Sequence, residues 1–175
     1  QRPAPYGVAQ HPYLVAGDGL VDRWTLDLPA EQVLEVTADR LIPTGLRDVA
    51  GSDFDFRRAR TIGTTELDHA FTSLATADDG LVHARVTHAD GTGVECLWDP
   101  ATLPWVQVHT ADLPDPAESR RGLALEVLHG LAGAVDDHAF VLKVASESDG
   151  QSLEGDLVAD AFYDHNGSRH LCLPA

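Results

Sequence analysis

Four polar side chains stand at strand-like positions among apolar neighbours, where an unpartnered charge or amide costs several kcal/mol. They are His11, Asp68, Gln107 and Glu126. Imidazole and carboxylate groups are the usual acids and bases of enzymes, because they exchange protons under physiological conditions. Acid–base chemistry is therefore one interpretation of this set of residues.

A structural interpretation exists for each of the four residues as well. Glu126 closes the run Gly–Leu–Ala–Leu–Glu at residues 122–126, which predicts a short buried strand. Alternation along a strand also allows an edge strand from which Glu126 faces water. The other structural interpretations are a turn cap for His11, a pairing with Arg57 or His69 for Asp68, and a cross-strand hydrogen bond for Gln107.

Other common site chemistries find no support in the sequence. The nine histidines fall at spacings that match no two-ligand helical motif, and no cysteine pair joins them. No Gly-x-Ser-x-Gly elbow occurs, and no Gly-rich loop opens a helix after a strand. We therefore predict neither a metal nor a cofactor.

Charge narrows the choice of partner. The 175-residue chain has 28 acidic residues against 12 Lys and Arg, which gives a formal net charge of −16. Nucleic-acid affinity depends on cationic side chains that neutralise phosphates, so this balance disfavours nucleic acids and suits a neutral small molecule. No run of about 18 apolar residues is present, so we expect no membrane-spanning segment.

Cysteine and methionine usage bear on compartment and processing. Two cysteines, Cys96 and Cys172, are too few for a disulfide or zinc framework, and their spacing does not determine whether they meet. The N-terminus lacks the order of charges and apolar residues of a secretory signal. We therefore expect reduced thiols and a cytoplasmic protein. The sequence contains no methionine, which predicts a fragment or a clipped product.

The elements that must position the four residues are predicted to be strands. Apolar and polar residues alternate over several short segments separated by turn residues, with a hairpin loop at 89–93. This pattern is typical of an all-β sandwich or barrel. Residues 38–40 are predicted to form a polar turn, and residues 41–45 are predicted to run extended into a further turn. The alternating segments are 24–28, 32–37, 81–88, 94–98 and 105–110.

The pattern changes after Glu126, which divides the chain at this stage into residues 1–126 and 127–175. Residues 127–138 are compatible with a helix, although Gly130 and Gly133 weaken it. The alternation of Phe140, Leu142 and Val144 predicts one further strand.

Six short blocks contain or flank the four polar residues: 10–13 (QHPY), 41–45 (LIPTG), 54–57 (FDFR), 67–71 (LDHAF), 105–110 (WVQVHT) and 123–126 (LALE). In order and spacing they resemble the N-H-x-Y, LIPTG, FDFR, Y-D-H-x-F, G-V-Q-x-Y-T and L-x-x-E motifs of the aldose 1-epimerases, or galactose mutarotases. The agreement of six ordered blocks is far more specific than any one of them.

The resemblance implies an antiparallel β-sandwich of the galactose-mutarotase-like supersandwich type, and interconversion of the α and β anomers of a neutral aldohexose. In that family a Glu takes the proton of the anomeric hydroxyl while a His protonates the ring oxygen, so that the ring opens and closes again. Matching the motifs makes Glu126 the base and His11 the acid. Asp68 and Gln107 are then expected to bind sugar hydroxyls.

The resemblance covers residues 1–126 and only the later part of the family pattern. No stretch like N-x-L-H-G-G, which supplies a second His and an Arg in the family, occurs here. The sequence also departs from the family directly after Glu126, which either a shifted reading frame or a divergent tail explains. We therefore expect an incomplete sandwich with open strand edges and a weakly active or inactive piece.

Two other functions stay open on the residues. A non-catalytic carbohydrate-binding module of the same sandwich type would stack Trp105 or Phe71 on a sugar ring. An epimerase of hexose 6-phosphates would need clustered arginines near the site, for which the candidates are Arg57, Arg58 and Arg60. The structural alternative for these arginines is a solvated basic patch.

Overall fold

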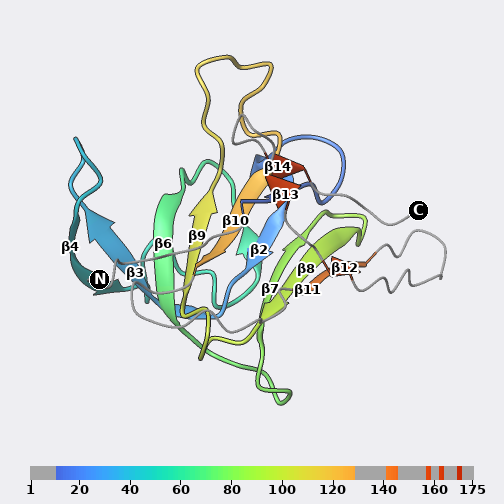
Figure 1. Ribbon diagram of the computed structural model, residues 1–175. Coiled ribbons are helices and arrows are strands. Elements are labelled where there is room, and N and C mark those ends of the chain that lie inside the picture. The colour runs from blue at the N-terminus through green and yellow to red at the C-terminus, as the bar shows by residue number, and fades with distance from the viewer. Residues whose placement is uncertain (1–10, 129–140, 146–156, 159–161, 164–168, 171–175) are drawn as a thin grey trace.

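The computed structural model describes residues 11–128, 141–145, 157–158, 162–163 and 169–170, nearly all of which lie in strands and the turns between them (Figure 1). Among these residues the helical structure is a 3₁₀ turn, η1 (Val21–Arg23), and no helix is long and apolar enough to cross a membrane. The strands are β1 (Tyr13–Leu14), β2 (Thr25–Asp27), β3 (Ala30–Val36), β4 (Pro43–Asp48), β5 (Arg60–Thr61), β6 (Asp68–Leu74), β7 (Val82–Thr87), β8 (Gly93–Trp98), β9 (Trp105–His109), β10 (Leu123–Leu128), β11 (Val141–Ala145), β12 (Leu157–Val158), β13 (Phe162–Tyr163) and β14 (Arg169–His170).

The strands form two six-stranded antiparallel sheets and one small pair. Sheet A has the order β1-β10-β9-β6-β3-β4, sheet B has the order β12-β11-β8-β7-β2-β5, and β13 pairs with β14. Figure 1 shows β3, β6, β9 and β10 side by side, with β7 and β8 of the second sheet beyond them. The predicted all-β sandwich of the galactose-mutarotase-like type is therefore confirmed.

The core lies between the two sheets and follows from alternation along each strand. In β9 the side chains of Val106 and Val108 are buried, whereas Gln107 between them is partly exposed. Because neighbouring residues of a strand point to opposite faces, sheet A has a core face and an opposite face, called here the outer face. The largest buried side chains of the core are Trp24, Trp98, Phe56 and Phe71.

Sheet A ends in two contrasting edges. At one edge β1 pairs with β10 over only two residues, Tyr13 with Ala124 and Leu14 with Leu123. At the other edge every residue of β4 is exposed. This edge begins with Pro43 and ends in charged residues, which are features that discourage pairing with a further strand.

The turn predicted at residues 38–40 is confirmed, but the turn predicted to follow the extended residues 41–45 is wrong. β4 starts at Pro43 and runs through Thr44 and Gly45 to Asp48. Pairing with β3 overrides the local turn chemistry: Gly45 stands opposite Glu35, and the register shifts between Glu35 and Val36. The shift absorbs the irregular backbone at the hairpin.

The segment after Glu126 begins as strand. Val127 and Leu128 continue β10 opposite Val106 and Trp105, so the predicted helix is wrong for its first two residues. The rest of that helix lies outside the described residues. The predicted further strand is confirmed as β11, which pairs along its length with β8 and so belongs to sheet B. The division of the chain after residue 126 stays a prediction.

Substitution of Gly93 on β8 tests how closely β7 and β8 pack in sheet B. A Cβ atom at this position would lie 2.5 Å from the carbonyl oxygen of Val86, which belongs to the paired strand. Gly93→Ala is therefore expected to lower the free energy of unfolding by about 1–3 kcal/mol, measured by urea denaturation. In Gly45→Ala the new Cβ would meet nothing within 4 Å, so this control is expected to be neutral or slightly stabilising. Equal losses in both variants would contradict the close pairing of β7 with β8.

Candidate functional site

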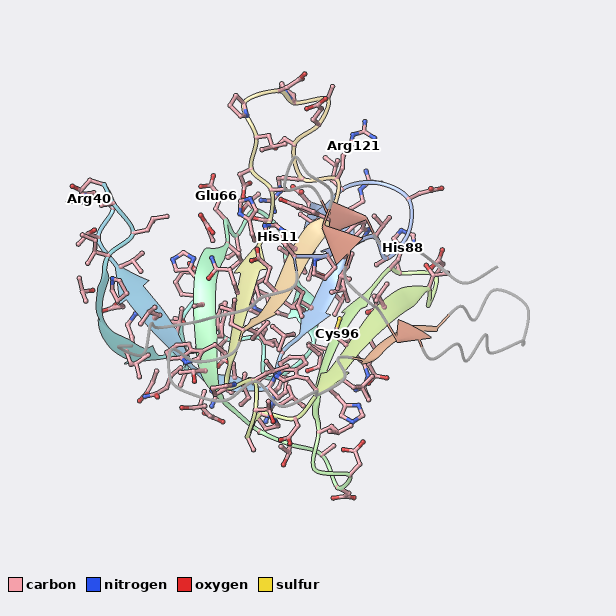
Figure 2. The ribbon with its side chains drawn as sticks, viewed as in Figure 1. His11, Arg40, Glu66, His88, Cys96 and Arg121 are labelled. Atoms are coloured by element: carbon pink, nitrogen blue, oxygen red, sulfur yellow. The ribbon has the colours of Figure 1, made fainter. Side chains whose placement is uncertain are left out.

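The outer face of sheet A brings the four predicted residues together. Glu126 on β10 stands directly opposite Gln107 on β9, and Asp68 begins β6 one strand further on. His11 lies two residues before β1, on the other side of β10. Figure 2 shows His11 near β9 and β10, in a different part of the molecule from Cys96.

His11 and Glu126 form a direct pair. Nε2 of His11 lies 2.9 Å from Oε1 of Glu126, and the two side chains are 49% and 15% exposed. The pairing follows from the antiparallel register, because Tyr13 stands opposite Ala124 and the residues two positions further out therefore face each other. The interpretation of Glu126 as a water-facing residue of an edge strand is wrong, since β10 is paired on both sides.

The surroundings of Glu126 shift the pKa of its carboxyl group. Its partial burial raises the pKa of the carboxyl group above the usual value, His11 and His109 act in the opposite direction, and Asp68 adds to the rise. Burial disfavours the charged form, whereas a neighbouring cation favours it. A carboxylate with a raised pKa beside an imidazole is the arrangement that general acid–base chemistry uses.

Gln107 and Asp68 form a second polar pair on the same face. The Nε2 amide of Gln107 donates a hydrogen bond of 2.7 Å to Oδ1 of Asp68. The suggested pairing of Asp68 with Arg57 is wrong, because Arg57 donates instead to Asp55 and Glu31. With 54% of its side chain exposed, Asp68 can also accept hydrogen bonds from a ligand.

His109 is a residue of this face to which the four-residue prediction gave no role. It lies two positions after Gln107 on β9 and stands opposite both Asp68 and Ala124. Its Nδ1 is 3.2 Å from the carbonyl oxygen of Leu67 and 3.8 Å from Oδ1 of Asp68. Alternation along β9 was the signal for it, because residues i and i+2 of a strand share a face.

Arg120 holds together the loops that lead into the site strands. Nε donates to Asp22 at 2.7 Å, one Nη donates to Asp112 at 2.5 Å, and the other donates to the carbonyl oxygen of Gly63 at 2.7 Å. The side chain is only 12% exposed. Asp112 follows β9, Arg120 precedes β10, and Gly63 precedes β6. Arg120 therefore links the approaches to three site strands, and no motif predicted it.

The thiol group of Cys96 lies away from this face, on sheet B. Cys96 is a free cysteine buried in β8, where burial raises the pKa of its thiol to about 12 and leaves it protonated. Cys172 lies outside the described residues. Within the part of the chain that the structure describes, no three His, Cys, Asp or Glu side chains are grouped to hold a metal ion.

Comparisons with known proteins identify the family of the chain. The model of the family described as Aldose 1-epimerase matches residues 1–130. The uncharacterized protein YihR of Escherichia coli K12 is 37% identical over 124 residues, which are 70% of this chain and 36% of YihR. The chain thus spans little more than a third of the length of this curated relative.

Two solved structures share the fold. A GalM/aldose epimerase homologue from C. elegans matches with a TM-score of 0.58 at 20% identity, over 73% of this chain and 43% of that one. A putative aldose 1-epimerase from Escherichia coli K12 matches with a TM-score of 0.51 at 14% identity, over 71% and 40%. Because the family model matches residues 1–130, well over half of the sequence, and the fold agrees, the chain belongs to the aldose 1-epimerase family.

Proposed function

We propose that the chain acts in the interconversion of the α and β anomers of a neutral aldohexose, with His11 and Glu126 as acid and base. One observation carries this proposal: His11 Nε2 and Glu126 Oε1 are 2.9 Å apart. In a pyranose the anomeric hydroxyl oxygen and the ring oxygen are bonded to the same carbon. The two groups that exchange protons with them must therefore be close neighbours, as these two are.

The proton transfers balance within the pair. The Glu126 carboxylate takes the proton of the anomeric hydroxyl, the His11 imidazolium gives a proton to the ring oxygen, and the bond from C1 to the ring oxygen breaks. The product is an open-chain aldehyde, which rotates about the C1–C2 bond. Closure on the other face reverses both transfers and restores the carboxylate and the imidazolium.

Gln107 and Asp68 are proposed to hold the sugar during this cycle. The two side chains extend the polar surface from Glu126 across β9 to β6. Their mutual hydrogen bond of 2.7 Å fixes both orientations before a ligand binds. A prearranged amide and carboxylate suit hydroxyl groups, which both donate and accept hydrogen bonds.

The two alternative functions fit the structure less well. Phe71 belongs to the core with 0% exposure, so it cannot stack on a sugar, and Trp105 is the remaining aromatic candidate on the outer face. Among the arginines, Arg57 is bound to two carboxylates, and Arg60 donates to backbone carbonyls of residues 53 and 55. A phosphate at Arg57 or Arg60 would have to displace these partners, and Arg58 alone is not the cluster of arginines that such a site needs.

The test follows the optical rotation of freshly dissolved α-D-galactose or α-D-glucose in the presence of the 175-residue chain. Because the chain spans little more than a third of its curated relative, we expect a weak acceleration over the rate in buffer. His11→Gln is expected to lower kcat by up to about 10²–10⁴-fold, toward the buffer rate. The matched control is His83→Gln, because His83 also contacts a glutamate, at 2.7 Å, but lies on sheet B. A wild-type rate equal to that of buffer, or full activity in His11→Gln, would overturn the proposal.

A further inference from the structure

His109 occupies a place on the outer face that the acid–base pair does not use. On β9 it stands between Ala124 of β10 and Asp68 of β6. These three residues form one row of cross-strand partners, and Glu126 with Gln107 belongs to the next row. The side chain is 25% exposed, so it is partly ordered by its neighbours and still reachable from solvent. An imidazole in such a position can bind a ligand directly.

The contact with Leu67 indicates which nitrogen of His109 carries a proton. A carbonyl oxygen only accepts hydrogen bonds, and the one of Leu67 lies 3.2 Å from Nδ1. Nδ1 therefore carries hydrogen, and in the neutral ring Nε2 bears the lone pair. Among the described residues, the structure shows no hydrogen-bond partner for Nε2.

The spacing of the two rows matches the two ends of a hexose. Residues i and i+2 of a strand are about 7 Å apart, so Gln107 and His109 reach different parts of a bound ring. If the reacting carbon C1 lies at His11 and Glu126, the row of His109 and Asp68 meets the hydroxyl groups on the far side, at C3 and C4. The row of Glu126 and Gln107 would contact the reacting end of the sugar, and the row of His109 and Asp68 would contact the hydroxyl groups at the opposite end.

We propose that His109 is a specificity-determining residue whose Nε2 accepts a hydrogen bond from the C3 or C4 hydroxyl of the sugar, beside Asp68. This inference rests on the proposed function, because it assumes that a hexose occupies the outer face of sheet A. It adds a residue to the site and assigns it the hydroxyl groups remote from the reaction. A hydroxyl-binding group of this kind discriminates against analogues that lack the hydroxyl.

Calorimetric binding of D-galactose and its 2-, 3- and 4-deoxy derivatives tests the assignment. For the wild type, removal of either the C3 or the C4 hydroxyl is expected to weaken binding about three- to tenfold more than it does in His109→Phe, in which the bond is already lost. His109→Gln places a polar atom near the position of Nε2 and is expected to keep the penalty. His109→Asn, which reaches only to the position of Nδ1, is expected to lose it.

Several outcomes would overturn the assignment. Equal deoxy-sugar penalties in the wild type and in His109→Phe would show that His109 contacts no hydroxyl, and His83→Phe on sheet B serves as the control for loss of an imidazole. The ¹⁵N shifts of the unsubstituted protein give an independent reading, since a proton on Nε2 instead of Nδ1 would contradict the assignment. Binding without anomerisation would refute only the proposed function, whereas a wild type that binds none of these sugars would refute both.

Discussion

Glu126→Gln is expected to lower kcat for mutarotation by about 10²–10⁴-fold. Glutamine preserves the shape of the side chain but cannot take the proton of the anomeric hydroxyl. The matched control is Glu95→Gln, because Glu95 also contacts a histidine, at 2.7 Å from His83, but lies on sheet B. Polarimetry of both variants measures the difference. Catalysis that survives Glu126→Gln would show that the base has been assigned to the wrong residue.

The same variant separates catalysis from stability. Burial raises the pKa of Glu126 in the folded chain, so between its unfolded and folded pKa values the native state binds more protons. Stability contributed by this group therefore falls as pH rises through that window, and the charged form weakens the fold at neutral pH. Glu126→Gln is thus expected to unfold at the same or a higher urea concentration at pH 7. If Glu126 is the base, as proposed, the acidic limb of the pH–rate profile is expected above the ordinary Glu range.

Arg120→Ala is expected to lower the free energy of unfolding by about 2–4 kcal/mol, measured by urea denaturation with an unchanged m value. The substitution leaves the carboxylates of Asp22 and Asp112 without their shared cation and the carbonyl oxygen of Gly63 without its donor. Solvent relieves part of this cost, because the two carboxylates are 37% and 29% exposed.

Two variants separate the possible causes of this loss. Arg121→Ala removes the exposed neighbouring arginine and is expected to change stability by no more than about 0.5 kcal/mol. Arg120 has a left-handed backbone with φ +58°, so Arg120→Gly is expected to recover about 1 kcal/mol relative to alanine. If Arg120→Ala were as mild as Arg121→Ala, the contacts of Arg120 with Asp22, Asp112 and Gly63 would not stabilise the fold.

The fold was largely predictable from alternation, because burial of one strand face leaves a period of two in the sequence. Val106 and Val108 against Gln107 are an example, and the same parity places Phe71 on the core face, three residues after Asp68. The turn predicted to follow the extended residues 41–45 failed, because pairing with β3 outweighed the local preference of Pro, Thr and Gly. Tertiary pairing decides such cases.

The site was less accessible to the same reasoning. The contact between His11 and Glu126 depends on the register of β1 against β10, which are far apart in sequence, and no period within either strand specifies that register. The family resemblance supplied this pair. Arg120 lies in an irregular loop and acts through carboxylates and carbonyl groups from three other segments, a combination with no signature in sequence.

The contact between His11 and Glu126 depends on the attachment of the short strand β1 to sheet A. Glu126 stands on a strand with partners on both sides, whereas His11 is carried by an edge strand that pairs over two residues. Short edges detach at a lower free energy than the whole domain needs to unfold. If His11 and Glu126 act as proposed, they can exchange protons with one sugar only while this edge is attached. The rate of anomer interconversion would then depend on the local equilibrium between attached and detached β1, and the stability of the sandwich as a whole would set only its upper limit.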